Sequence, residues 1–205
     1  MTDKQSISVS LSRLEGYCRE LSYKGWDPYD GLNSRVFKTL PVINDFDVAR
    51  LAWIQLFKRN PVNLRKLFLV PKGYNPKGIA LMLNGYCNLS GYQKQSGELL
   101  IVDEGELSER IRFLADLLIS LRSHTGSNIA SWGYNFDWQA RRLFLFPAGT
   151  PTVVVTSFCA SALFSAYGIT KNEEYLSLAL SSADFVLNDL HRTPKKGLPL
   201  LLLTS

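Results

Sequence analysis

The chain has 205 residues and a formal net charge of +5, and 46% of its residues are hydrophobic. This length is sufficient for one domain with a core, and the composition excludes a disordered chain. The basic residues are scattered, so the mild positive charge predicts a solvated surface and no nucleic-acid partner. No segment reaches the roughly 20 apolar residues of a membrane span, and the polar start shows no signal peptide.

The cysteines and histidines narrow the chemistry further. Cys18, Cys87 and Cys159 are far apart and odd in number, so we expect reduced, mostly buried thiols in a cytoplasmic protein. No Cys/His pair has zinc spacing and no glycine-rich dinucleotide motif occurs, so the sequence predicts neither a metal nor a cofactor. His124 and His191 lie in a polar loop and at a helix end, which gives a Ser-His-Asp site little support.

Apolar residues recur at steps of three and four in six stretches, which predicts six helices and no strands. The predicted helices span residues 6–23, 45–60, 76–89, 104–123, 151–167 and 170–190. Helix 151–167 starts after the cap residue Thr150, ends at Gly168 and carries no charge, so we expect it to be buried on all sides. The short turn that follows makes the last two helices an αα-hairpin, and charged helices alternate with apolar ones as in two concentric layers.

Residues 1–191 are predicted to form a single partial domain, and residues 192–205 an irregular tail. The tail ends in a run of leucines, residues 200–203, and a folded domain rarely ends with exposed leucines. We therefore expect a truncation or a frameshift near Lys196. Three predicted loops are long, residues 24–44, 91–103 and 125–149, and such loops are often functional.

The first of these loops carries the motif WDPYDGLNS. Pro28 and Gly31 favour a compact turn, which would bring Asp27 and Asp30 close together. Close carboxylates can divide acid and base roles, or bind a hard cation together with Asn33. Alternatively, both carboxylates accept hydrogen bonds from turn amides, and a three-residue spacing alone leaves these alternatives open.

The third loop carries WGYNFDWQ at residues 132–139, with an aromatic residue at every second position. If the segment is extended, the rings share one face and the polar side chains share the other. If it is irregular, one or two rings could stack on sugar rings. Asp137 is then the best candidate for an acid or base, and Arg141 could bind a uronate or phosphate. The competing interpretation places the rings in the core and pairs Asp137 with Arg141 or Arg142.

Three stretches carry a family resemblance: WDPYDGLNS at 26–34, WGYNFDWQARRLFLFPAGTPTVVVTSF at 132–158 and EEYLSLALSSADFVLNDL at 173–190. They resemble a bacterial family of the six-hairpin glycosidase-like superfamily that is associated with cell-surface polysaccharide production. The resemblance implies an all-α fold, an α/α toroid of antiparallel helical hairpins. The chain holds about three of the six hairpins, so it looks like an N-terminal half. An open half would expose inner-helix surface, which predicts self-association or a missing C-terminal half as a partner.

We expect a protein that cleaves, modifies or binds a carbohydrate; an enzyme of this kind would be a glycoside hydrolase, lyase or epimerase. The candidate catalytic residues are Asp137, Asp27 and Asp30. The candidate substrate-binding residues are Trp26, Tyr29, Asn33, Trp132, Tyr134, Asn135, Trp138, Gln139 and Arg141.

Three alternatives stay open. The first is a non-catalytic glycan-binding or scaffold subunit of a biosynthetic complex, which gains support if Asp27 and Asp30 are both bound to backbone amides. The second is a terpenoid-cyclase-like or prenyltransferase-like toroid that binds an isoprenoid lipid, which predicts an apolar cavity floor. The third is a non-functional product of a broken gene.

Overall fold

The computed structural model describes residues 3–98, 101–124, 129–140, 144–189, 192–195 and 198–201. These residues are mostly helical, which confirms the predicted all-α class. The six long helices correspond to the six predicted ones. They are α1 (Asp3–Glu20), α4 (Asp47–Arg59), α5 (Pro76–Ser96), α6 (Glu104–Ser120), α7 (Val153–Thr170) and α8 (Glu173–Asp184), and a π-helical turn (Phe185–Asp189) extends α8.

Several segments that were predicted to be irregular are ordered. The loop after α1 contains a 3-10 turn η1 (Asp30–Asn33) and the short helices α2 (Arg35–Lys38) and α3 (Pro41–Asp45). The prediction of no strands is wrong: β1 (Trp138–Gln139) pairs with β2 (Leu145–Phe146), and β3 (Arg192–Lys195) with β4 (Leu198–Leu201), both antiparallel. The expected irregular tail therefore contains a short hairpin. Lys196 lies outside the described residues.

Side-chain caps set the helix boundaries. The Asn75 side chain accepts from the backbone N–H of Lys77 at the start of α5, and Pro76 occupies the first turn. Thr152, and not the predicted Thr150, caps α7 by accepting from the N–H of Val155. The helix does not stop at Gly168, the predicted end. It continues to Thr170, where Lys171 adopts the left-handed conformation that closes it.

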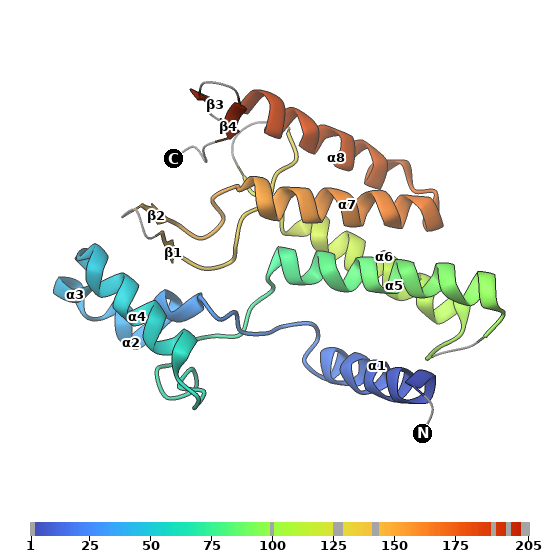
Figure 1. Cartoon of the computed structure of the whole chain (residues 1–205), viewed down its shortest axis with the longest axis horizontal. Helices are drawn as coiled ribbons and strands as arrows, with labels where there is room; N and C mark the ends of the chain where they lie inside the picture. The colour runs from blue at the N-terminus through green and yellow to red at the C-terminus, as the bar shows by residue number, and fades with distance from the viewer. Residues whose placement is uncertain are drawn as a thin grey trace.

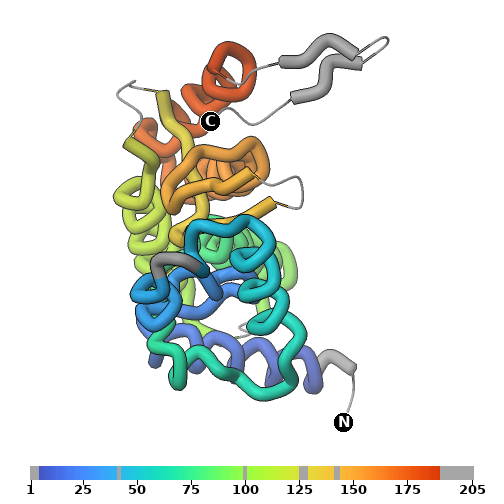
Figure 2. The backbone as a smooth tube through the Cα atoms, turned by 90° about the vertical axis from the view of Figure 1, so that its left-hand side faces the viewer, coloured from blue at the N-terminus to red at the C-terminus, as the bar shows by residue number. Residues whose placement is uncertain are grey.

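Two antiparallel hairpins, α5–α6 and α7–α8, form the main body of the molecule (Figure 1). Helix α5 contacts both α6 and α7, and α7 also contacts α6 and α8. Seen from the side, the hairpins stack above α1 (Figure 2). Their shared core is mostly aliphatic, and its fully enclosed members include Ile79, Leu83, Ile111, Leu114, Leu118, Val155, Cys159 and Leu163. We call this body the hairpin core.

Helix α7 is not buried on all sides, which corrects the prediction. Val154 and Phe164 remain 47% and 57% exposed, on a stripe that also includes Ser157 and Ser161. By length and composition, α7 is the one helix in the described part of the chain that could cross a membrane. Its opposite face packs against α5, α6 and α8. Cys18, Cys87 and Cys159 are free and buried, as predicted.

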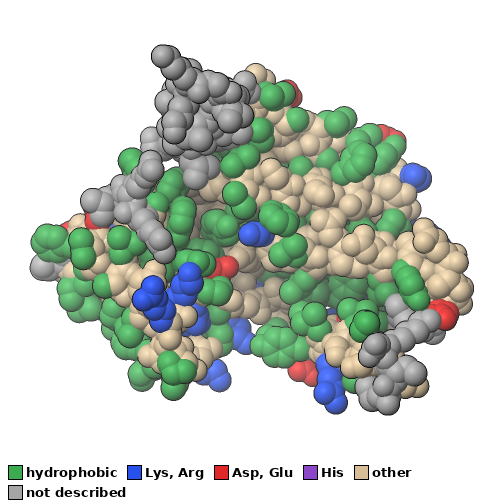
Figure 3. Space-filling model, viewed as in Figure 1, with side chains coloured by type: hydrophobic (Ala, Val, Ile, Leu, Met, Phe, Trp, Pro, Cys, Tyr) green, Lys and Arg blue, Asp and Glu red, His purple; other side chains and the backbone are tan. Residues whose placement is uncertain are grey.

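A small second lobe is built from η1 and α2–α4. In Figure 1 it lies on the left, at the opposite side from the turn that joins α7 to α8. Its core consists of Leu32, Phe37 and Ile54. Trp53 covers this core, stacks on Phe37 with ring centroids 4.9 Å apart, and donates from Nε1 to the carbonyl of Gly31. We call this part the α4 lobe. The space-filling view shows the molecule hollowed between the α4 lobe and the hairpin core (Figure 3).

Candidate functional site

The hollow contains a cavity of about 670 Å³ that is lined by residues of both conspicuous motifs. WDPYDGLNS contributes Tyr29, and WGYNFDWQ contributes Tyr134, Phe136 and Trp138. We call this cavity, defined by these four rings, the aromatic cleft. Two loops that are about a hundred residues apart therefore meet at one end of the helices, as a shared site requires.

Ring stacking fixes the geometry of the cleft. The Tyr134 and Phe136 rings stack with centroids 5.1 Å apart, and Trp138 stacks on Phe146 of β2 at 5.2 Å. The pKa of Tyr134 is raised, first by burial and then by the nearby Asp27 carboxylate and Tyr29 phenol. The Tyr134 hydroxyl therefore stays protonated at neutral pH and can donate a hydrogen bond to a ligand.

The structure places Trp132 in the hairpin core and not in the cleft, although we predicted it as a binding residue. Its side chain is 0% exposed, and Nε1 donates to the carbonyl of Leu118 at 2.8 Å. Its backbone N–H donates to Thr156 Oγ1, and its carbonyl accepts from the N–H of Thr152 at 3.0 Å. Trp132 thus anchors the start of the motif to α6 and α7.

Gly133 lets the loop pass close to the segment before α7. It forms an isolated bridge with Pro151, and a Cβ at this position would lie 2.1 Å from the carbonyl oxygen of Thr150. The next residue, Tyr134, accepts at its carbonyl from the N–H of Gly149 at 2.7 Å. These contacts hold the backbone that carries the Tyr134 ring.

Asp27 and Asp30 do lie close together, but both are bound to backbone amides. Asp27 Oδ1 accepts from the N–H of Tyr29 and Asp30 Oδ2 accepts from the N–H of Asp27, both at 2.9 Å. The second Asp27 oxygen accepts from Asn75 Nδ2 at 2.9 Å, which ties the turn to the start of α5. The second Asp30 oxygen accepts from Arg65 Nε at 2.8 Å. Burial raises the pKa of Asp30, and the guanidinium of Arg65 opposes this shift.

Asp137 also has a structural contact. Its Oδ1 accepts from the backbone N–H of Ala148 at 2.8 Å, and its Oδ2 lies 4.0 Å from Lys38 Nζ. Asp137 therefore joins the two arms of the β1–β2 hairpin across its base. Arg141 and Arg142, the partners predicted for Asp137, lie outside the described residues.

The remaining polar candidates link the two loops or the two parts of the molecule. Asn33 Nδ2 donates to the carbonyl of Asn135 at 3.2 Å. Gln139 lines the aromatic cleft and accepts at Oε1 from Arg50 Nε of α4 at 2.7 Å. Trp26 donates from Nε1 to the carbonyl of Val70 at 2.9 Å and does not line the aromatic cleft.

Several residues of the cleft were not predicted. Lys58, in the last turn of α4, donates to the Tyr29 hydroxyl at 2.5 Å and lies 4.3 Å from the centroid of that ring. Lys77, in the first turn of α5, lies 4.8 Å from the Phe158 ring. Aliphatic side chains complete the wall: Leu51, Ile54, Leu81 and Val154. Single basic or aliphatic residues on helices carry no local sequence signal that separates them from other surface positions.

Among the described residues, no three His, Cys, Asp or Glu side chains gather where they could hold a metal ion. Asp27 is the one carboxylate among the described residues that line the aromatic cleft. No protein-family model, curated protein or solved structure matches this chain. The fold and the site therefore define a helical protein with an aromatic-lined cleft between two lobes.

Proposed function

We propose that the chain binds a carbohydrate in the aromatic cleft, as a non-catalytic glycan-binding protein of cell-surface polysaccharide metabolism in the cytoplasm. The observation that carries this proposal is the convergence of Tyr29, Tyr134, Phe136 and Trp138 on one cavity. Its volume of about 670 Å³ lies within the usual range for small-molecule sites. Aromatic rings pack well on the apolar C–H faces of sugars, and the tyrosine hydroxyls and the lysines can hydrogen-bond to sugar oxygens.

Binding is better supported than cleavage because of the state of the carboxylates. Glycoside hydrolysis usually needs two carboxyl groups that flank the scissile bond, one as acid and one as base or nucleophile. Asp27 has both oxygens engaged by N–H donors, and Asp30 is buried against Arg65. Asp137 accepts from Ala148 and does not line the cleft. The hydrolase, lyase and epimerase alternatives would require these carboxylates to leave their present partners.

The same proposal includes the half-toroid architecture. Adjacent antiparallel hairpins, with α5 and α7 in contact, are the repeating unit that such a toroid needs. The exposed stripe of α7 outside the cleft, with Phe164, supports a surface for self-association or for further hairpins.

Two substitutions in the cleft test the proposal against one outside it. We expect Tyr134→Ala and Trp138→Ala each to weaken binding of a neutral oligosaccharide about tenfold or more, because buried aromatic anchors dominate such sites. Tyr92→Ala, on the exposed face of α5, should leave the affinity unchanged. Isothermal titration calorimetry against a set of neutral and acidic oligosaccharides measures these affinities. Equal affinity of all three variants and the wild type would refute the glycan site.

Asp27→Asn separates binding from cleavage. The amide keeps one acceptor oxygen but its NH₂ group cannot accept, so one of the two hydrogen bonds to this side chain is lost and the variant should retain oligosaccharide binding within about threefold. If the wild type releases a cleaved or isomerised sugar and this variant does not, the catalytic alternative replaces the binding one.

The aliphatic wall favours a second candidate, an isoprenoid lipid. Leu51, Ile54, Leu81 and Val154 give the cleft an apolar wall against which such a ligand could pack. Leu81→Gln, at a half-exposed wall position, should weaken binding of a polyprenol and leave oligosaccharide binding intact. The reverse pattern would remove the lipid candidate.

A further inference from the structure

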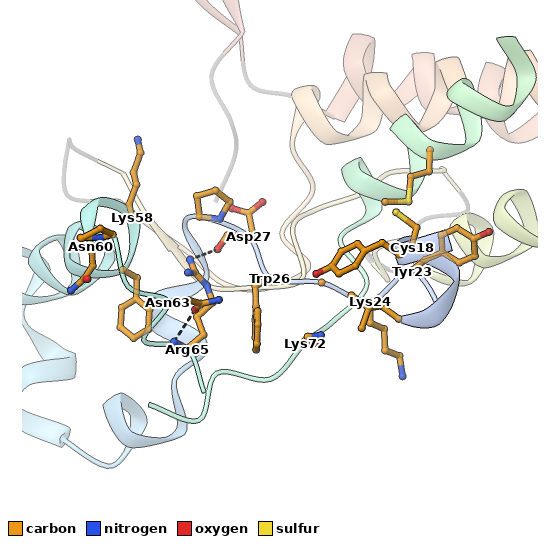
Figure 4. A pocket seen from close by; sticks show the side chains of 17 residues that line it. Cys18, Tyr23, Lys24, Trp26, Asp27, Lys58, Asn60, Asn63, Arg65 and Lys72 are labelled. Atoms are coloured by element: carbon orange, nitrogen blue, oxygen red, sulfur yellow. Dashed lines mark hydrogen bonds between the residues drawn. The ribbon is translucent and has the colours of Figure 1, made fainter. Parts of the chain in front are cut away.

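A second cavity, of about 460 Å³, is also lined by the Asp27–Pro28 turn (Figure 4). It shares Asp27, Pro28 and Lys58 with the aromatic cleft, so the two cavities adjoin at this turn. Its basic wall residues are Lys24, Lys58, Arg65 and Lys72, and we call it the cationic cavity.

Each of the three lysines is held over an aromatic ring. The ammonium groups of Lys24, Lys58 and Lys72 lie 5.1, 4.3 and 4.9 Å from the centroids of Tyr74, Tyr29 and Trp26 respectively. A ring face attracts an ammonium group without cancelling its charge. These contacts therefore restrict where the ammonium groups lie and leave them able to bind an anion.

Within the described part of the chain, the cavity wall carries more positive than negative charge. Asp27 is the one described carboxylate in its wall, and both of its oxygens already accept hydrogen bonds. No described carboxylate lies within 4.0 Å of the ammonium groups of Lys24, Lys58 or Lys72. An excess of positive charge around a concave surface raises the local concentration of anions.

The type of cation indicates the type of anion. Arg65 is already engaged, because Nε donates to Asp30 Oδ1 and Nη2 to the carbonyl of Asp27, both at 2.8 Å. The cations that remain are ammonium groups, which bind phosphate as point charges, and a phosphate group carries more negative charge at pH 7 than a carboxylate does. Figure 4 shows Lys24 and Lys72 on one side of Trp26 and Arg65 on the other.

We propose that the cationic cavity binds the phosphate or diphosphate group of a phosphorylated saccharide whose sugar occupies the aromatic cleft. The assignment of the sugar end rests on the proposed function, but the phosphate end stands on the lysines alone. Lys58 lines both cavities, at the turn where they adjoin.

The first test uses inorganic pyrophosphate as the probe on the full chain. Its binding is followed by calorimetry and by the fluorescence of Trp26, which forms part of the wall. We expect Lys24→Gln/Lys72→Gln to weaken binding about tenfold, and the wild-type affinity to fall as salt rises. Lys66→Gln/Lys94→Gln, which removes the same charge from exposed positions outside both cavities, is the matched control. Equal affinity of the two double variants would overturn the proposal.

A second set of titrations identifies the source of the phosphate. Glucose 1-phosphate represents a soluble glycosyl phosphate, and vesicles that contain a polyprenyl phosphate represent a lipid-linked one. Whichever of the two binds should lose affinity in the Lys24/Lys72 variant and not in the control. A short single-stranded oligonucleotide serves as a competing polyanion. If it displaces pyrophosphate, and if its own affinity is the same for the wild type and the Lys24/Lys72 variant, the cavity site is overturned.

The two proposals fail separately. Pyrophosphate binding that depends on Lys24 and Lys72, without any oligosaccharide binding, would keep the phosphate site and remove the glycan function. Oligosaccharide binding that depends on Tyr134 and Trp138, without pyrophosphate binding, would do the opposite.

Discussion

The hairpin core and the aromatic cleft are built from similar residues by different means. In the hairpin core, periodic aliphatic side chains of α5–α8 enclose one another, and Trp132 is fully buried among them. In the cleft, the rings of Tyr134 and Trp138 stay partly exposed, and the loops that carry them are held by hydrogen bonds from side chains to backbone. Trp132 and Trp138 lie six residues apart in one motif and belong to different regions.

This difference separates residues that maintain the fold from residues available to a ligand. A ring that is enclosed and hydrogen-bonded inside the core contributes to stability, and its loss leaves a cavity. A ring that stacks on one neighbour and faces an opening contributes less to stability and more to binding. The carboxylates follow the same division, because those that bind turn amides shape the loops.

The strongest test of the comparison is the pair Trp132→Ala and Trp138→Ala. We expect Trp132→Ala to lower the free energy of unfolding by about 4 kcal/mol, because it empties a fully enclosed site. Trp138→Ala should cost about 1 kcal/mol, chiefly the stack on Phe146, while it impairs glycan binding. Urea unfolding followed by far-ultraviolet circular dichroism measures both. Equal destabilisation by the two substitutions would abolish the distinction between the regions.

The helices could be predicted from the sequence because apolar periodicity extends over many residues. Their ends were harder to place, since an end depends on one local contact. Thr150 and Thr152 are both good cap residues, and only Thr152 has the geometry to accept from Val155. Gly168 is a typical helix end, yet α7 continues through it and ends at a left-handed Lys171.

For the site, the sequence indicated the two loops and most of the rings but not their roles. Alternation in WGYNFDWQ treats Trp132 and Trp138 alike, whereas the bends at Asn135 and Phe136 give the segment an irregular path. The spacing of Asp27 and Asp30 could not reveal that Arg65, more than thirty residues later, pairs with Asp30. Such contacts depend on the tertiary fold, which no local pattern encodes.

The next test concerns the buried pair that supports the cleft turn. Asp30 and Arg65 are both buried, so Arg65→Met should lower the free energy of unfolding by about 3 kcal/mol near pH 7. Burial already raises the pKa of Asp30, and removal of the guanidinium raises it further. A carboxyl group whose pKa is higher in the folded than in the unfolded state stabilises the fold at pH values below its unfolded-state pKa, about 3.9. This stabilisation is lost as the pH rises through the folded-state pKa.

The deficit of Arg65→Met should therefore shrink as the pH falls from about 7 toward about 4, because the buried Asp30 of the folded variant then becomes protonated and neutral. Urea titrations of wild type and variant across this range measure the difference. The control is Asp30→Asn/Arg65→Met, which leaves no buried charge and should recover most of the stability near pH 7. A deficit that does not change with pH would show that Asp30 is not the group left without its partner.

The smallest expected effect compares two glycines, one from each region. Gly133→Ala should cost about 2 kcal/mol, because the new Cβ meets the backbone of Thr150 and must displace it. Gly85→Ala, in the exposed middle of α5 with open space around its Cβ, should raise the stability by about 0.5–1 kcal/mol. Urea unfolding measures both changes, and oligosaccharide titration should show lower affinity for the Gly133 variant alone. If Gly133→Ala binds as the wild type does, the close approach at Gly133 does not position the Tyr134 ring in the cleft.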